Sequence, residues 1–352
     1  MTFQTTWFLL IAVLWVGYFI LEGFDFGVGM LLPFVSRNEA DRRAVLTTLG
    51  PVWDGNEVWL LVAGGATFAA FPEWYATLFS GFYLPLFLIL ISLIVRGVAF
   101  EYRSKYGKAQ WRQRWDVAIL ISSAIPALLW GVAFANIVRG VPIEKSAQGN
   151  LEYVGGFFNL LNPYALLGGV VTLTVFLTHG AIFLSLKTAG SIRERSRDLA
   201  AKIGLVAAIA AVAFLVWTNL MLPALDPIVV TLSAVVALAW VAGLLATVKV
   251  REGWAFIFSA VAIATFVSNL FFALYPRVMP SSLGAQFDLT ITNASSTEYT
   301  LKVMTVVAVI MTPLILIYQG WTYWVFRKRI SASQIVNPER GVLDTATHIL
   351  HQ

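Results

Sequence analysis

The chain has 352 residues, of which 59% are hydrophobic and 12% are charged, and its formal net charge is +5. Soluble domains carry about 25% charged residues, so this composition excludes an ordinary water-soluble domain. The positive charge does not indicate nucleic-acid binding, because the basic residues fall in short loops between apolar runs. With no cysteine, the chain has no disulfide, no thiolate metal site and no redox thiol.

Long apolar runs dominate the sequence, and runs of about 18 or more apolar residues are typical of membrane-spanning helices. In lipid, a helix satisfies its backbone hydrogen bonds within one segment. The sequence therefore predicts an all-α polytopic membrane protein, with one integral membrane domain over residues 1–352. A resemblance described below adds the expected grouping into two four-helix bundles and one peripheral helix. We expect nine spanning helices, at roughly 7–33, 54–71, 77–99, 115–138, 162–186, 200–222, 227–248, 254–275 and 302–326.

Lysine and arginine are distributed unevenly over the loops between these helices. Twenty of the 24 basic residues fall on one face of the membrane, and the other four are Arg139, Lys145, Arg277 and Lys302. Loops rich in Lys and Arg stay in the cytoplasm. We therefore expect the N-terminus outside the cell and the C-terminus in the cytoplasm.

The first predicted helix carries two acids, Glu22 and Asp25. Their spacing of three residues places them on one helix face. Acids at membrane depth are costly unless they are neutral, paired with a base or in contact with water. Two interpretations remain open: a structural hydrogen bond or ion pair between helices, and a proton relay.

The second predicted helix begins with Trp53-Asp-Gly-Asn56-Glu57. Asp54 and Glu57 repeat the spacing of three residues, this time at the cytoplasmic mouth. One interpretation is an N-cap, with Asp54 capping the first turn and Glu57 completing a capping box. The other is a proton relay, which a capping carboxylate does not exclude. All four acids would lie on the cytoplasmic half, which suits proton uptake from the cytoplasm.

Arg96 ends the third predicted helix. It is either an interfacial arginine whose head snorkels to water or the partner of a buried acid or of an anionic group. His179 stands alone in the fifth helix, and a lone histidine is more often a hydrogen-bonded bundle residue than a metal ligand.

Several segments in chain order resemble subunit II of the cytochrome bd quinol oxidases, over nearly the whole chain. They are Gly23-Phe-Asp-Phe-Gly-Val-Gly29, Trp53-Asp-Gly-Asn56 with Trp59, Ala63-Gly-Gly-Ala66, Phe79-Ser-Gly-Phe-Tyr83, Phe100-Glu-Tyr-Arg-Ser104, Met279-Pro-Ser-Ser282 and Leu301-Lys-Val-Met-Thr305. The resemblance implies an oxidase that reduces dioxygen to water with electrons from a membrane quinol and takes its protons from the cytoplasm. It places the chain in a bacterial or archaeal cytoplasmic membrane.

The resemblance further implies that subunit I carries the haems, of types b and d, and oxidises the quinol. This chain would ligate no metal and hold no catalytic residue. It would support subunit I, with a small single-helix accessory subunit and membrane lipid as further partners. Some members hold a quinone as a structural filler in subunit II, so a structural quinone stays open.

For single residues, Asp54 matches a family acid assigned to a proton pathway that crosses into subunit I, and Asp25 matches another family acid. With Glu22 and Glu57 they form the predicted proton pathway, and Trp53, Asn56 and Arg96 are expected to support it. The alternative function is a proton-coupled secondary transporter, which interrupted helices with charges at the midplane would favour.

Overall fold

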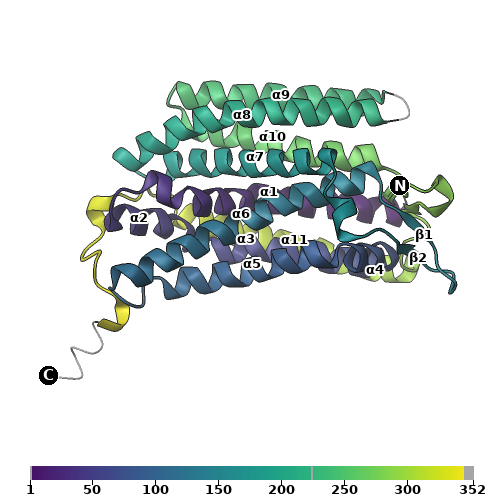
Figure 1. Ribbon diagram of the computed structural model, residues 1–352, viewed down its shortest axis with the longest axis horizontal. Helices are drawn as coiled ribbons and strands as arrows, with labels where there is room; N and C mark the ends of the chain where they lie inside the picture. Colours follow the sequence, from purple (N-terminus) through teal and green to yellow (C-terminus); the bar gives the residue numbers. More distant parts are fainter. Residues whose placement is uncertain (1, 223–224, 345–352) are drawn as a thin grey trace.

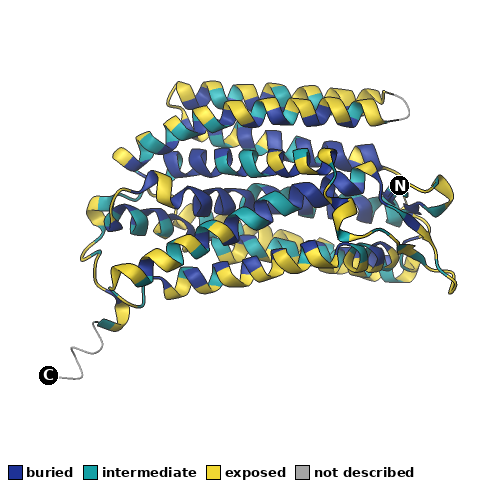
Figure 2. Cartoon of the chain, viewed as in Figure 1, coloured by how far each residue is buried: buried dark blue, intermediate teal, exposed yellow. Residues whose placement is uncertain are grey.

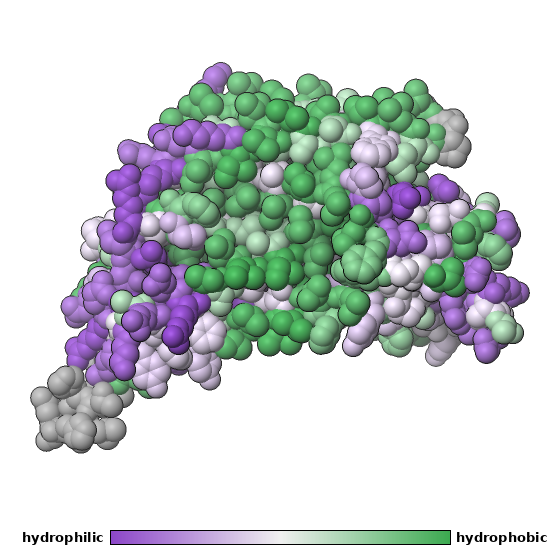
Figure 3. Space-filling view, viewed as in Figure 1, coloured by the Kyte–Doolittle hydropathy of each residue, from purple (hydrophilic) through white to green (hydrophobic). Residues whose placement is uncertain are grey.

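The computed structural model describes residues 2–222 and 225–344, and the long helices lie side by side along one direction (Figure 1). His348 and His351, near the C-terminus, lie outside the described residues. Apolar side chains cover a band around the middle of the molecule, and hydrophilic side chains gather at its two ends (Figure 3). This distribution confirms the predicted all-α polytopic membrane protein.

The first four-helix bundle is built around α1 (Phe3–Val35), which contacts α3 (Trp53–Ala70) and α6 (Ala109–Arg139). Its fourth member, α5 (Tyr83–Tyr102), packs against α6. Two shorter helices complete this half, α2 (Glu39–Leu49) after α1 and α4 (Pro72–Gly81) before α5.

The second bundle consists of four consecutive helices. They are α7 (Pro163–Lys187), α8 (Ser191–Met221), α9 (Pro227–Val248) and α10 (Glu252–Leu274). The Asp226 side chain caps α9 by accepting from the backbone N–H of Ile228 at 2.7 Å. Pro227 occupies the first position of the helix, where its missing N–H costs little, as predicted.

The seam between the bundles is formed mainly by α7, which packs against both α6 and α1; α1 and α7 are largely buried (Figure 2). Here Gly27 of α1 faces Gly180 of α7, and a Cβ added at Gly27 would lie 2.8 Å from the Cα of Gly180. Small residues let membrane helices approach with their backbones nearly in contact. Both halves therefore pack on one shared central helix, α1.

Helix α11 (Glu298–Val325) is peripheral. Leu301 is its only buried residue among those described, and its neighbours are α1 and α3. At its N-terminal end the Trp7 indole N–H donates to the Leu301 carbonyl at 3.1 Å and to Thr305 Oγ1 at 3.0 Å. The contacts of the long helices therefore give two four-helix bundles and one outlying helix.

The loops at both ends fold onto the bundles. At one end are the hairpin of β1 (Ile143–Lys145) and β2 (Leu151–Tyr153), the pair β3 (Arg277–Met279) and β4 (Leu289–Thr290), and the 3₁₀ turns η1 (Phe157–Leu160) and η2 (Ala285–Phe287). At the other end residues 326–344, including η3 (Ala332–Gln334), cross from the α7–α8 loop to the α5–α6 loop. Ile330 N–H donates to the Lys187 carbonyl, and Val342 N–H to that of Ser104.

The helices differ from the predicted ones in three respects. Eight helices of the described residues are long and apolar enough to span a membrane, and α3, predicted as a ninth span, falls outside them because its polar first turn lowers its hydropathy. The helix predicted at 77–99 is broken at Phe82 into α4 and α5. Helices α6 and α8 begin about six and nine residues earlier than predicted, because their first turns are polar and extend beyond the apolar run.

We predict that Gly27→Val destabilises the seam by about 1–3 kcal/mol, the usual range for overpacking a filled site. The added side chain would overlap the backbone of Phe176 and Gly180, which cannot move like a side-chain tip. The measurement is thermal unfolding of the purified protein. Gly253→Ala, at a helical glycine with nothing within 4 Å of the new Cβ, is the matched control and should melt like the wild type.

Candidate functional site

A cluster of charged side chains lies buried where α1, α3 and α5 meet. Glu22, Asp25 and Arg96 are each 0% exposed. The Arg96 Nη2 group donates to Glu22 Oε1, and it lies 3.3 Å from Glu57 Oε2, whose side chain is 22% exposed. Arg96 therefore pairs with buried acids, and the snorkelling interpretation is wrong.

Asp25 is bound by an amide instead of a base. The Asn56 Nδ2 group donates to Asp25 Oδ2 at 2.8 Å. On its other side, Asn56 Oδ1 accepts from Tyr323 Oη at 2.7 Å and from Gln319 Nε2 at 3.3 Å, both on α11. The peripheral helix thus reaches the acid cluster through Asn56.

Aromatic rings enclose the guanidinium. The Arg96 Cζ lies 4.5 Å from the centre of the Phe26 ring and 5.8 Å from that of Phe100, distances at which a cation is attracted to a ring face. Trp53 in turn packs against Phe100, with ring centres 5.4 Å apart. Four buried atoms have no hydrogen-bond partner among the described residues: Glu22 Oε2, Asp25 Oδ1, Arg96 Nε and Arg96 Nη1. Because buried polar atoms normally have partners, these four are where the cluster can bind a further donor, acceptor or proton.

Asp54 is separate from this cluster and lies exposed on the surface. The predicted N-cap is wrong: α3 begins at Trp53, its N-cap residue is Val52, and no side chain caps it. Asp54 instead sits in the first turn, where the helix dipole favours a negative charge. It lines a groove of about 520 Å³ between α3 and α11 that also contains Asn56, Gln319 and Tyr323.

The structure therefore brings together Glu22, Glu57 and Arg96, and joins Asp25 to Asn56. It leaves Asp54 at the surface, one helical turn from Glu57. Gln319 and Tyr323 were not predicted as site residues. Their spacing of four residues puts two polar groups on one face of an otherwise apolar helix, and that spacing was the available signal.

An ion-pair network outside the spanning segments lies at the end where the basic residues gather. Arg103, 0% exposed, binds both oxygens of Glu39, at 2.8 and 2.9 Å, and also pairs with Asp116. Burial by itself raises the pKa of Glu39, but the hydrogen bonds and charges of Arg103, with those of Arg112 and Arg43, outweigh it and hold the pKa below its usual value.

His179 has both ring nitrogens in use. Nδ1 is 2.8 Å from Ser259 Oγ, and Nε2 is 3.2 Å from the Ile20 carbonyl. In the part of the chain that the structure describes, no group of three histidine or acidic side chains is placed to hold a metal ion.

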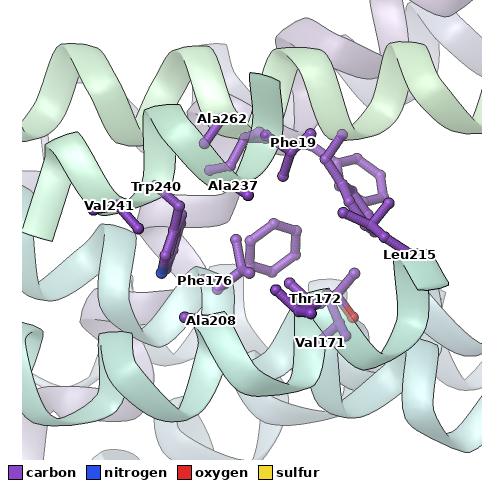
Figure 4. A pocket seen from close by; sticks show the side chains of 16 residues that line it. Phe19, Val171, Thr172, Phe176, Ala208, Leu215, Ala237, Trp240, Val241 and Ala262 are labelled. Atoms are coloured by element: carbon purple, nitrogen blue, oxygen red, sulfur yellow. The ribbon is translucent and has the colours of Figure 1, made fainter. Parts of the chain in front are cut away.

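The structure also has two apolar hollows outside the charged cluster. The first is a cavity of about 70 Å³ in the second bundle, where Phe19, Phe176 and Trp240 converge (Figure 4). The one hydroxyl that lines this cavity, Thr172 Oγ1, donates a hydrogen bond to the Ala127 carbonyl at 2.6 Å. The second is a groove of about 420 Å³ over α3, α4 and α5. Trp74 lines this groove, and its buried indole N–H has no partner among the described residues.

Comparison with known proteins gives consistent matches. A family model described as cytochrome bd terminal oxidase subunit II matches residues 3–326. The chain is 42% identical over 328 residues to cytochrome bd ubiquinol oxidase subunit 2 of Bacillus subtilis (strain 168), covering 92% of this chain and 96% of that protein. It is 39% identical over 364 residues to cytochrome bd-I ubiquinol oxidase subunit 2 of Escherichia coli (strain K12), covering 94% and 95%. A chain in the structure of bd oxidase from Geobacillus thermodenitrificans shares the fold, with a TM-score of 0.73 at 18% identity, covering 93% of this chain and 100% of that one.

We predict that Glu39→Gln lowers stability at neutral pH by about 1.5–3 kcal/mol, the usual range for hydrogen bonds to a charged group. The folded pKa of Glu39 lies below its unfolded value, so its contribution is complete above the unfolded value. The contribution is lost as pH falls through the folded pKa. Thermal unfolding from pH 7 to pH 3 should show the gap between variant and wild type closing in acid. A gap that persists unchanged to pH 3 would contradict this assignment.

Proposed function

This chain belongs to the cytochrome bd terminal oxidase subunit II family and is thus a subunit of a quinol:oxygen oxidoreductase complex, and on that premise we propose that it conducts protons. The protons enter at Asp54, on the cytoplasmic face, and pass through the buried acids toward a haem-bearing subunit I. There they are consumed as dioxygen is reduced to water. The chain also supports subunit I structurally.

The observation that carries this proposal is a row of acids from the surface into the first bundle. Asp54 is exposed, Glu57 is partly exposed one turn further along α3, and Glu57 contacts Arg96, which binds the buried Glu22. From Asp54 through Glu57 to Glu22, the side chains become steadily less accessible to water. A proton path into a membrane protein needs this gradation, because bulk water does not reach the interior.

The charge balance of the cluster also favours proton binding. Glu22 and Glu57 share the guanidinium of Arg96, and Asp25, on the same helix as Glu22, is bonded to the Asn56 amide with no base paired to it among the described residues. An unbalanced negative charge in a low-dielectric interior is strongly unfavourable. The cluster therefore holds protons at rest and can pass one on when a neighbouring charge changes. Asn56 donates to Asp25 and keeps it in a defined position.

The remaining parts of the proposal rest on family membership with a physical argument for each. The Lys and Arg residues of the α2, α5–α6 and α7–α8 connections favour a cytoplasmic location for these connections, and hence an N-terminus outside the cell. His179, the one histidine among the described residues, is poorly suited to ligate haem iron, because both of its ring nitrogens are hydrogen-bonded. We therefore assign the b and d haems and quinol oxidation to subunit I. A single-helix accessory subunit is a further proposed partner.

A structural quinone or a lipid suits the groove over α3, α4 and α5. The groove is lined mostly by apolar and aromatic side chains, and the Trp74 N–H lacks an acceptor there. A quinone or ester carbonyl would supply that acceptor. The cavity of about 70 Å³ in the second bundle has no free polar group among the described residues and suits such a molecule less well. No observation favours the transporter alternative.

We predict that Asp54→Asn slows oxygen consumption by roughly 10- to 100-fold, because loss of a proton-transferring group commonly costs at least that much. Haem content should stay normal, since Asp54 makes no ion pair or hydrogen bond within the described residues. The measurement is quinol-driven oxygen uptake and the visible spectrum of the purified complex.

Glu73→Gln is the matched control. Glu73 is also an exposed acid in a first turn, but it starts α4 at the opposite end of the molecule, and its loss should leave turnover unchanged. Wild-type turnover in Asp54→Asn would remove the proposed role, and loss of haem would make Asp54 structural.

The predicted orientation can be tested with single introduced cysteines. Because the chain has no native cysteine, each introduced one is its only labelling site. Glu152→Cys and Lys108→Cys are both at exposed positions, at opposite ends of the molecule. A membrane-impermeant maleimide applied to intact cells should label the first and not the second. The reverse pattern would overturn the proposed cytoplasmic proton entry.

A further inference from the structure

The hydrogen bonds that reach Asp25 form a directed chain which begins on a group that can only donate. The Trp59 indole N–H donates to Gln319 Oε1 at 2.9 Å. Gln319 Nε2 donates to Asn56 Oδ1 at 3.3 Å, and Asn56 Nδ2 donates to Asp25 Oδ2 at 2.8 Å. The chain runs from α3 to α11, back to α3, and ends on α1.

The direction of this chain follows from chemistry. An indole has a donor and no acceptor, so it faces the oxygen of the Gln319 amide and turns the amide nitrogen toward Asn56. Asn56 then receives donors on its oxygen, from Gln319 and also from the Tyr323 hydroxyl at 2.7 Å. Its NH₂ group is left for Asp25. Such a network decides the orientation of an amide that could otherwise turn by half a rotation.

We propose that the peripheral helix α11, through Gln319 and Tyr323, locks the Asn56 amide so that its NH₂ group donates to Asp25, which weakens the hold of this carboxyl on its proton. Gln319 and Tyr323 are positioning residues, because they act on Asp25 through Asn56. If the lock is released, the Asn56 amide can turn its oxygen to Asp25, and a carboxyl that faces an oxygen must carry the proton.

The weak attachment of α11 to the bundle allows its position, and with it the hydrogen bonding of Asn56, to change. Only 6% of its most apolar window is buried. Its polar contacts with the bundle lie near its two ends. Trp7 bonds Thr305 near one end; near the other are the Asn56 set and the bond from Lys187 Nζ to the carbonyl of the C-cap residue Phe326. Polar contacts between membrane helices average about 0.6 kcal/mol each. A small displacement of α11 therefore breaks the lock without unfolding either bundle.

The other charged and titratable groups around Asp25 come from each helix near it. Glu22 and Tyr18 lie on α1 itself, Glu57 is on α3, Arg96 is on α5 and Tyr323 is on α11. None of them makes a hydrogen bond to Asp25, whose one bonded partner among the described residues is Asn56. The variants below leave all of these groups in place except the Tyr323 hydroxyl.

The test is an infrared pH titration of the purified oxidase complex carrying Gln319→Met with Tyr323→Phe. These changes remove both donors to Asn56 Oδ1 at nearly constant side-chain volume. The band of the protonated Asp25 carboxyl is identified as the one absent in Asp25→Asn. We expect its midpoint to rise by about one pH unit, a tenfold increase in proton affinity.

Two controls separate the lock from general loosening of α11. Thr305→Val weakens the other anchor of the helix and should leave the Asp25 titration unchanged. Tyr299→Phe makes the same chemical change as Tyr323→Phe at a position 78% exposed on the same helix, and it should also have no effect.

An unchanged midpoint in the double variant overturns the proposal, as does an equal shift in Thr305→Val. If the double variant does not assemble, Tyr323→Phe alone decides: a smaller rise supports the lock, and none overturns it. The infrared band reports on Asp25 directly, so this test can fail while the Asp54 pathway holds, and the reverse is also true.

Discussion

The burial of one guanidinium between carboxylates is the constraint on which the rest of the first bundle depends. Arg96 is 0% exposed and contacts Glu22 and Glu57, which come from two other helices. A buried charge without its partner is strongly destabilising, by about 3–5 kcal/mol. The register of α1, α3 and α5 relative to one another is therefore set by these contacts. Apolar packing alone specifies such a register weakly, since lipid is as apolar as a leucine side chain.

Helix α1 connects this constraint to the second bundle. The two acids of α1, Glu22 and Asp25, lie just before Gly27, where the backbone of α7 comes into close contact with α1. The acids are therefore held on a helix that is fixed on both sides. Their other neighbour, α11, is held by a few polar contacts. A rigid acid with an adjustable hydrogen-bond donor is an arrangement in which protonation can respond to the position of one helix.

Most of the fold can be predicted from the apolar runs in the sequence, and most of the site's acids from their spacing of three residues. The residues that pair with these acids cannot be predicted in this way. Apolar runs predict where helices lie, although they miss α2, whose residues are mixed, and the break at Phe82. The shared face of Glu22 and Asp25 is local information. The pairing of Arg96 with Glu22 joins residues that are 74 positions apart in the sequence, and that of Gln319 with Asn56 joins residues 263 positions apart. Local spacing does not predict such contacts. Capping failed as a prediction because Asp54 lies inside the first turn and not before it.

Helix α3 shows how the demands of spanning a membrane and of carrying polar groups are reconciled. Its Asp-Gly-Asn-Glu start makes it too polar to be recognised as a span by hydropathy. Asn56 and Glu57 turn inward, where Asp25 and Arg96 satisfy them, while Asp54 stays at the helix end, where the first-turn amides favour an anion. Polar groups of a membrane helix are tolerated where protein supplies their partners. The polar side chains of α3 therefore depend on α1 and α5 for their partners, so the buried acids and the assembly of the bundle are parts of one structure.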